Sequence, residues 1–256
     1  MITVLKSREE VDKVLAKLHD EDLPLHVTPQ KNWDHFLIKE LTRDKSRDLR
    51  IVDVGSGDGY TLEFLHRLGF DNISGIDLSI PRRRLVKRFF RRMVRRRFVG
   101  TDLVRRGDMC NTGLPDASVD LITSVSVIEH NVPKRAFLEE CARILRPEGV
   151  IYLSTDYWED AEMDDGTRVP LFDTDWTIQN KPMIEELVRM ASEADLELLQ
   201  ASDIPATGER TVSYYGYEYT FIALEFTKRI GVPSNSTGAL LTGARSTQTR
   251  PAGVAP

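Results

Sequence analysis

The chain has 256 residues, enough for one α/β domain with a sizeable hydrophobic core and some additional segments. Its hydrophobic fraction of 41% and charged fraction of 29% are ordinary for a soluble globular protein. No apolar run approaches the ~18 residues of a membrane-spanning helix, and the N-terminus lacks the apolar core of a secretory signal. Cys110 and Cys141 have no metal-ligand spacing, so we predict reduced thiols, no metal and a cytoplasmic location.

The N-terminal part of the chain predicts two amphipathic helices. Apolar residues recur at helical spacing over 3–18, and a second stripe that includes Trp33 follows over 30–43. A proline-containing loop is expected between the two helices.

A glycine-rich segment follows. Residues 51–60 read IVDVGSGDGY, which predicts a buried strand, a sharp turn and a helix that begins near Tyr60. The alternate glycines from Gly55 to Gly59 permit positive φ and a close approach of the backbone to a ligand. Asp53 lies beside this loop, and an acid there suits a ligand that carries positive charge. A dinucleotide-binding loop reads G-x-G-x-x-G, whereas here the third glycine comes one residue early.

This D-x-G-x-G-x-G pattern resembles motif I of class I S-adenosylmethionine-dependent methyltransferases. Residues 117–131 (ASVDLITSVSVIEHN) and 143–155 (RILRPEGVIYLST) also resemble the fourth and fifth strands of the type 11 group. The resemblance implies a Rossmann-like, doubly wound α/β fold with helices on both faces. Its seven-stranded sheet would have the order 3-2-1-4-5-7-6 and an antiparallel last strand. S-adenosyl-L-methionine would be the cofactor.

The resemblance also assigns roles to residues at the ends of the first strands. Asp77 ends a short strand over 72–77 and suits the ribose hydroxyls, although such an acid also serves as a turn or cap residue. After a third strand over 102–109, Asp108 suits the adenine amine and Met109 the ring face. The complete set of expected cofactor-binding residues is Asp53, Gly55, Ser56, Gly57, Asp58, Gly59, Asp77, Leu78, Asp108, Met109 and Ser124.

Between these strands lies a strongly basic segment. Residues 80–106 hold twelve Lys or Arg and one acid, a local charge of +11 in a chain whose net charge is −5. The apolar stripe over 80–98 predicts a crossover helix packed on the sheet. Its ten basic residues from Arg82 to Arg97 either form a solvated face or meet an anionic partner. Candidates are a membrane surface, which would make the protein peripheral to the membrane, a phosphorylated or lipid-linked substrate or, ranked lower, nucleic acid.

The expected acceptor side comes from later segments and from the N-terminal helices. His130 is the candidate catalytic residue, because an imidazole can take a proton from a hydroxyl; a structural hydrogen bond is the alternative. A long acidic and aromatic loop over 156–180 follows the fifth strand, where ligands bind in open α/β sheets, unless it is a self-packed surface loop. The weaker substrate-side candidates are Trp33, His35, Asp156, Tyr157, Trp158 and Trp176, with a core anchor as the alternative for Trp33.

The remaining segments complete the expected organisation. A helix is predicted over 133–145, a helix and sixth strand over 181–200, and the final strand over 217–228. Residues 1–48 would form a helical cap over the cofactor cleft, residues 49–230 the class I methyltransferase domain, and residues 231–256 a disordered tail.

Together these features predict a methyltransferase that O-methylates a small molecule or glycan by in-line displacement. The sulfonium activates the methyl group, so the protein mainly has to align the nucleophile. The first alternative is a non-catalytic protein that docks on RNA or membranes through the basic helix. A less favoured one is an NAD(P)-binding oxidoreductase, because Tyr60 occupies a glycine position of the dinucleotide-binding pattern.

Overall fold

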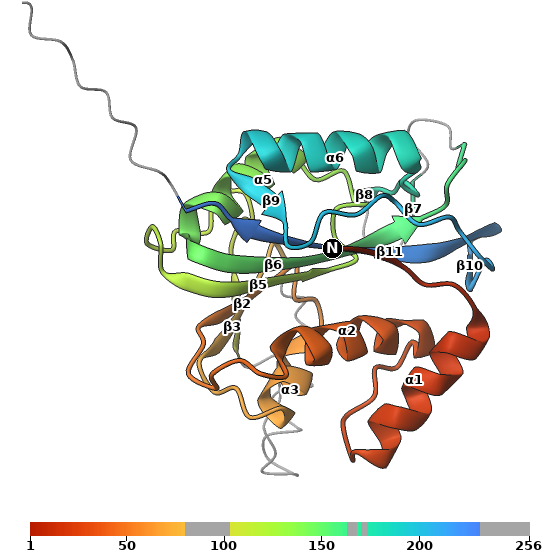
Figure 1. Ribbon diagram of the computed structural model, residues 1–256, viewed down its shortest axis with the longest axis horizontal. Coiled ribbons are helices and arrows are strands. Elements are labelled where there is room, and N and C mark those ends of the chain that lie inside the picture. The colour runs from red at the N-terminus through yellow and green to blue at the C-terminus, as the bar shows by residue number, and fades with distance from the viewer. Residues whose placement is uncertain (80–102, 163–167, 170–173, 231–256) are drawn as a thin grey trace, which may run out of the picture.

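The structure is a computed structural model that describes residues 1–79, 103–162, 168–169 and 174–230. A mixed β-sheet lies between two layers of helices (Figure 1). The crossover helix expected over 80–98 and the tail expected over 231–256 lie outside the described residues. Among the helices of the described residues, none combines the length and apolar character needed to cross a membrane.

Five parallel strands form one side of the sheet. In sheet order they are β4 (Val104–Arg106), β3 (Ile73–Asp77), β2 (Ile51–Val54), β5 (Val119–Val125) and β6 (Leu145–Tyr157). All four residues of β2 are buried, as expected for a parallel strand covered on both faces. The parallel arrangement brings the carboxyl ends of these strands to one edge, where the glycine loop begins.

The last long strand, β11 (Tyr217–Lys228), pairs antiparallel with β6. Three short antiparallel strands share its other edge: β10 (Val212–Tyr214), β1 (Ile2–Val4) and β9 (Leu196–Leu198). The predicted fold class is confirmed, and the predicted order 3-2-1-4-5-7-6 corresponds to β4-β3-β2-β5-β6-β11-β9, but the order differs in detail because β1 and β10 also pair with β11. The predicted number of seven strands is wrong, because in the described part of the chain β1 and β10 raise the number in this sheet to nine.

The N-terminal end of the first helix also differs from the prediction. The expected helix over 3–18 begins at Arg8 and runs to Asp20 as α1, because Ser7 caps it: its side chain accepts a hydrogen bond from the Glu10 N–H at 3.2 Å. The Glu10 carboxylate in turn accepts from the Lys6 N–H at 2.8 Å. This reciprocal cap separates the helix from β1, whose apolar residues complete the edge of β11.

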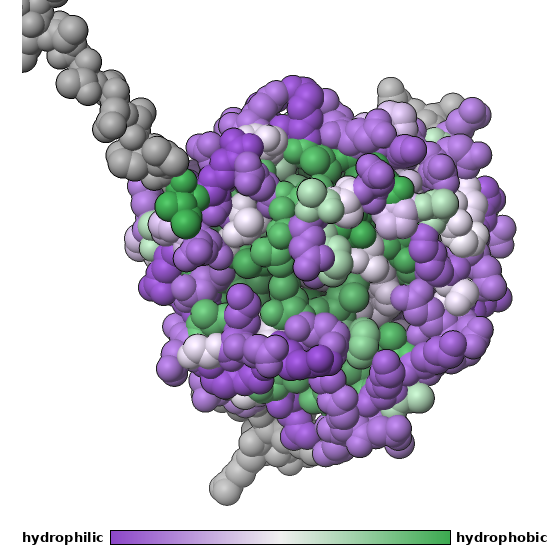
Figure 2. Space-filling model, viewed as in Figure 1, coloured by the Kyte–Doolittle hydropathy of each residue, from purple (hydrophilic) through white to green (hydrophobic). Residues whose placement is uncertain are grey.

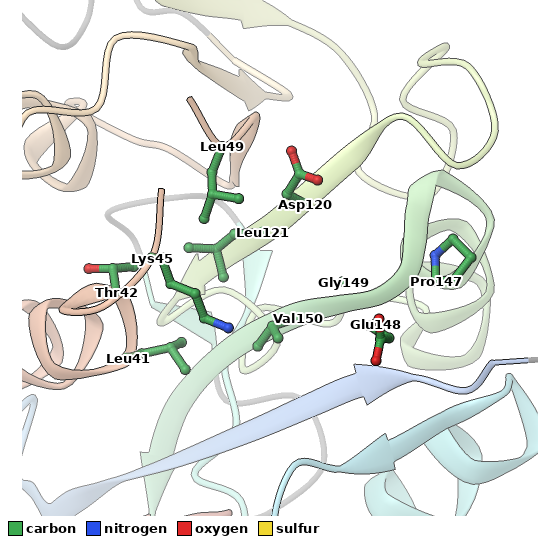
Figure 3. A pocket seen from close by; sticks show the side chains of 10 residues that line it. All are labelled: Leu41, Thr42, Lys45, Leu49, Asp120, Leu121, Pro147, Glu148, Gly149 and Val150. Carbon is green, nitrogen blue, oxygen red and sulfur yellow. The ribbon is translucent and has the colours of Figure 1, made fainter. Parts of the chain in front are cut away.

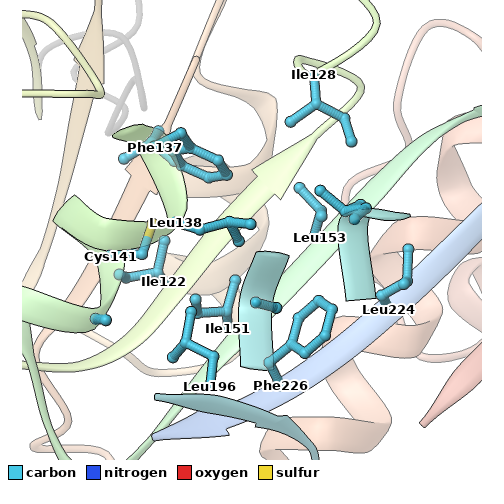
Figure 4. Packing of buried hydrophobic residues seen from close by; sticks show 14 of the residues in the cluster. Ile122, Ile128, Phe137, Leu138, Cys141, Ile151, Leu153, Leu196, Leu224 and Phe226 are labelled. Carbon is cyan, nitrogen blue, oxygen red and sulfur yellow. The ribbon is translucent and has the colours of Figure 1, made fainter. Parts of the chain in front are cut away.

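The helices divide between the two faces of the sheet. Helices α1, α2 (Asn32–Thr42) and α3 (Tyr60–Arg67) cover one face, and α5 (Lys134–Ile144) and α6 (Lys181–Glu193) cover the other (Figure 1). Successive residues of β6 point to opposite faces of the sheet and show this division. Tyr152 packs into the core beneath α1–α3, whereas Ile151 packs with Leu138 and Phe226 beneath α5 and α6 (Figure 4).

The segment after β6 is partly described. The short strands β7 (Arg168–Val169) and β8 (Thr174–Asp175) pair antiparallel within the predicted substrate-side loop. The loop returns to the end of β6, where the Gln179 N–H donates to the Asp156 carbonyl at 2.9 Å. It therefore brings Trp176 back to the carboxyl end of β6. A short 3-10 helix, η1 (Pro29–Lys31), precedes α2 on the same side of the sheet.

Candidate functional site

The glycine loop connects β2 to α3 as predicted. Gly55, Gly57 and Gly59 all have positive φ, at 71°, 48° and 74°. A Cβ on Gly55 would lie 2.4 Å from a methyl carbon of Val127, so a side chain there would collide with the segment after β5. The Gly55 N–H donates to the Ile76 carbonyl at 2.8 Å, which holds the loop against β3.

A further glycine, Gly75 in β3, allows this close seating and was missed in the sequence. A Cβ on Gly75 would lie 2.3 Å from the Ser56 hydroxyl oxygen and 2.8 Å from Leu62. A glycine inside a strand pattern signals such a close backbone approach. The NISGID segment therefore carries a second constraint on the shape of the loop.

Asp77 joins the loop to the end of β3. One carboxylate oxygen accepts from the Gly57 N–H at 2.8 Å, and the other accepts from the Ser79 N–H at 2.9 Å. Each oxygen keeps a further lone pair for a ligand donor. At the end of β4, Asp108 is exposed and accepts from the Cys110 N–H at 2.8 Å, while Met109 is buried. These residues stand at the carboxyl ends of adjacent strands, but their ligand contacts stay predictions.

The remaining predicted cofactor residues occupy different environments. Asp58 and Leu78 are exposed at the loop and after β3, whereas Ser124 is buried in β5. Asp53 lies beneath the loop, where one carboxyl oxygen accepts from the Thr123 hydroxyl at 2.6 Å. The Ser56 hydroxyl donates to the Asp53 carbonyl at 2.6 Å. Asp53 thus ties β2 to β5 and the loop, and burial raises its pKa to about 7.

We expect Asp53→Asn to change the pH dependence of stability. An unfolded aspartate titrates near pH ~4, so the stability that Asp53 contributes in its protonated form is present below that pH and is lost as pH rises through about 7. As pH rises from about 5 to about 8.5, the unfolding free energy of the variant should therefore increase by at least about 1 kcal/mol relative to that of the wild type. Urea unfolding of both proteins measures this, and a difference independent of pH would contradict it.

Two residues expected on the acceptor side, His130 and Asp156, lie near the carboxyl ends of β5 and β6. Glu129 is buried and accepts from the Thr155 hydroxyl at 3.0 Å, and buried Asp156 accepts from the Trp176 indole N–H at 2.8 Å. Burial, with the nearby Glu129, raises the pKa of Asp156 to about 7. His130 is half-buried, and burial lowers its pKa. The imidazole is therefore neutral near pH ~7 and can accept a proton.

A half-buried lysine, Lys31, which was missed in the sequence, brings its charge near these carboxyl groups. The Lys31 ammonium lies 3.8 Å from the centre of the Phe221 ring. It is enclosed and makes no hydrogen bond to any residue that the structure describes. Its charge lowers the pKa of Asp34, Glu129 and Asp156, against the upward effect of their burial. The enclosed Lys31 ammonium therefore acts on three buried carboxyl groups, and Glu129 in turn raises the pKa of the half-buried Lys134, against the effect of its burial.

The predicted substrate-side residues divide into two groups. Asp156 and Trp176 meet at the site, and the Trp176 ring has edge contacts with Tyr214, Tyr217 and Tyr219 at centroid distances of 5.6–5.8 Å. Tyr157 instead packs in the core beneath α5 and α6.

The other three aromatic candidates lie elsewhere. Trp158 is partly buried, with the Arg210 guanidinium 4.4 Å from its ring centre. Trp33 is buried in the core, where its indole N–H donates to the Glu10 carboxylate at 2.8 Å. This environment agrees with the alternative interpretation of Trp33 as a core anchor. His35 is buried and stacks on Phe64 at 4.4 Å, between α2 and α3.

A separate pocket of about 120 Å³ lies at the opposite edge of the sheet. It is formed by the end of α2 and the starts of β5 and β6, with Lys45, Asp120 and Glu148 among its lining residues (Figure 3). Apolar residues also gather in the middle of the molecular face shown in Figure 2, with hydrophilic residues around them. Ligands of open α/β sheets bind at the carboxyl ends of the strands, so we assign the functional site to the glycine-loop edge instead.

Comparison with solved structures agrees with this architecture. A geranyl diphosphate C-methyltransferase from Streptomyces coelicolor, solved with S-adenosyl-L-homocysteine, has a TM-score of 0.56 and 18% identity, and the match covers 88% of this chain and 86% of that protein. A structure from Galdieria sulphuraria, described as that of a putative sarcosine dimethylglycine methyltransferase, has a TM-score of 0.54 and 18% identity, and the match covers 85% of this chain and 98% of that protein. The sheet order and the glycine loop thus define the class I S-adenosylmethionine-dependent methyltransferase fold.

Within that class, residues 52–153 match the family model described as a methyltransferase domain, of type 11. A probable S-adenosylmethionine-dependent methyltransferase of Mycolicibacterium smegmatis is 45% identical over 62 residues, 24% of each chain. The phthiotriol/phenolphthiotriol dimycocerosates methyltransferase of Mycobacterium tuberculosis is 33% identical over 133 residues, 50% of this chain and 46% of that protein. The matches thus span less than half the length of these relatives.

Proposed function

We propose that the protein binds S-adenosyl-L-methionine at the glycine-loop edge and transfers its methyl group to an acceptor. The hydrogen bond from the Gly57 N–H to Asp77 carries this proposal, because it fixes the loop and the expected ribose ligand at the ends of adjacent strands. The collision that a Cβ on Gly55 would cause shows a backbone shaped by close packing, as a cofactor cradle requires. The family match of residues 52–153 supports the same cofactor.

His130 is the proposed general base. S-adenosyl-L-methionine supplies a methyl group that its sulfonium already activates, so alignment of the acceptor is the main demand on the protein. The neutral imidazole of His130 lies in the segment after β5, and Asp156 near the end of β6 raises its pKa, opposing the effect of burial. His130 would take the proton of an acceptor hydroxyl as the oxygen–methyl bond forms and the sulfur–methyl bond breaks, which would leave S-adenosyl-L-homocysteine.

A small molecule or glycan with a hydroxyl group is the proposed acceptor. A ubiquinone biosynthesis O-methyltransferase of Cupriavidus pinatubonensis is 28% identical over 106 residues, 41% of each chain, which supports oxygen as the methylated atom. The aromatic side chains around Trp176 supply flat apolar surface beside Asp156. An anionic partner at Arg82–Arg97, including a peripheral membrane surface, stays a prediction on residues outside the described ranges.

Calorimetric titration with S-adenosyl-L-methionine tests the proposal. We expect binding by the intact protein and roughly 100-fold weaker binding by Asp77→Ala, because the variant loses charge-assisted hydrogen bonds to the ligand and to the loop. Asp71→Ala is the matched control, since Asp71 precedes the same strand, is exposed and pairs with His66. A wild-type protein that binds NAD but not S-adenosyl-L-methionine would reject the proposed cofactor and activity.

A further inference from the structure

His26, in the loop between α1 and η1, is held in a fixed position by its backbone. The buried Asn32 side chain accepts a hydrogen bond from the His26 N–H at 2.8 Å and donates to the His26 carbonyl at 3.2 Å. The same amide also donates to the Pro29 carbonyl at 3.0 Å and reaches the Thr28 carbonyl at 3.4 Å. One buried residue thus bonds four backbone groups of the turn that carries His26.

The orientation and tautomer of the imidazole are fixed as well. Its Nδ1 accepts from the Thr28 N–H at 2.9 Å, so the proton of the neutral ring is on Nε2. Burial, with the nearby Lys31 charge, lowers the His26 pKa to about 4, which keeps the ring neutral at physiological pH. Nε2–H makes no hydrogen bond to the residues that the structure describes. The ring therefore offers one N–H donor to a ligand.

This donor lies beside the cofactor loop. The His26 ring has an edge contact with Tyr60, the first residue of α3, at a centroid distance of 4.5 Å. The Asp58 carboxylate is close enough to raise the His26 pKa, against the larger effect of burial. A neutral N–H donor, a carboxylate and the N-terminus of α3 thus meet at one end of the glycine loop. Such a set matches an amino-acid zwitterion, because the donor and the helix end suit its carboxylate and Asp58 suits its ammonium group.

The orientation of the cofactor follows from the proposed function, on which this inference rests. Asp77, Asp108 and Met109 are at the ends of β3 and β4, which assigns the nucleoside to that side of the site. The methionine part would then extend across β2 towards β5, over the loop beside which His26 is held. We propose that His26 donates its Nε2–H to the carboxylate of the cofactor's methionine part and thereby discriminates S-adenosyl-L-methionine from derivatives that lack this group.

Decarboxylated S-adenosylmethionine provides the test, because it keeps the adenosine, the sulfonium and the amine and lacks the carboxylate. His26→Phe keeps a ring against Tyr60 and removes the donor. By calorimetry, it should bind S-adenosyl-L-methionine roughly 10-fold more weakly and the decarboxylated ligand as the wild type does, because a hydrogen bond to a charged group is lost. His26→Gln, whose amide nitrogen takes the place of Nε2, should restore part of the lost affinity.

The decarboxylated ligand also reports on folding, since a misfolded variant would lose it too. Equal weakening of both ligands in His26→Phe would overturn the inference, because the ring would then act through the loop rather than through the carboxylate. Unchanged affinities in that variant would also overturn it. A wild-type protein that binds neither ligand would reject the proposed function itself, and a wild-type protein that binds both equally well would reject the role of His26 alone.

Discussion

Replacing Gly55 by alanine is expected to destabilise the protein by about 3 kcal/mol and to abolish S-adenosyl-L-methionine binding. Two costs add. The backbone at Gly55 has φ at 71°, where an L side chain is strained, and the new Cβ would lie 2.4 Å from Val127. Relief of this contact would displace the loop from the Ile76 carbonyl that now accepts its N–H. Chemical unfolding and calorimetric titration measure the two effects.

A double-variant cycle separates the steric cost from the backbone strain. Val127→Ala removes the methyl carbons that the new Cβ would meet. The loss of unfolding free energy in the double variant Gly55→Ala, Val127→Ala should therefore be smaller than the sum of the two single losses by about 1 kcal/mol or more. Gly113→Ala is the control for backbone strain, because Gly113 has φ at 67° and open space where its Cβ would be. Strict additivity in the cycle would show that Val127 does not confine the loop.

The parts of the fold with strong local signals could be predicted from the sequence. The final strand over 217–228 was predicted with the bounds of β11, and the helix beginning near Tyr60 is α3. Alternation, glycine turns and helical periodicity act over a few residues, so they remain visible in a linear reading. The resemblance to a known fold then supplied the sheet order that local signals alone do not determine.

The missed features depend on contacts between distant segments. Ile2–Val4 became β1 because the edge of β11, more than two hundred residues later, offers it a partner. Gly75 is required by the Ser56 side chain of the neighbouring loop, and Lys31 acts on carboxyl groups of β6 and of the segment that follows β5. Trp33 has the local pattern of a cleft residue or of a core residue, and burial against Glu10 distinguishes the two. Such contacts arise from tertiary packing rather than local propensity.

Replacing Lys31 by methionine is expected to destabilise the protein by about 3 kcal/mol near pH ~8, because three buried carboxyl groups lose their nearby cation. The loss should be smaller near pH ~5.5. Without Lys31 the pKa values of Asp34, Glu129 and Asp156 rise further above those of the unfolded chain, so the stability contributed by their protonated forms is lost as pH increases. Urea unfolding at the two pH values measures the difference.

Lys39→Met provides the matched control for this charge removal. Lys39 is on α2 and also lies near an aromatic ring, that of Phe36. It pairs with Glu21 at 2.7 Å and does not shift the pKa of Asp34, Glu129 or Asp156. Its loss should cost no more than about 1 kcal/mol and should show little difference between the two pH values. Adding Glu129→Gln to Lys31→Met should recover part of the stability at the higher pH, because it removes one uncompensated charge. A Lys31 variant that is as stable as the Lys39 variant would mean that the three carboxyl groups are protonated without the lysine, and that the Lys31 ammonium does not stabilise them.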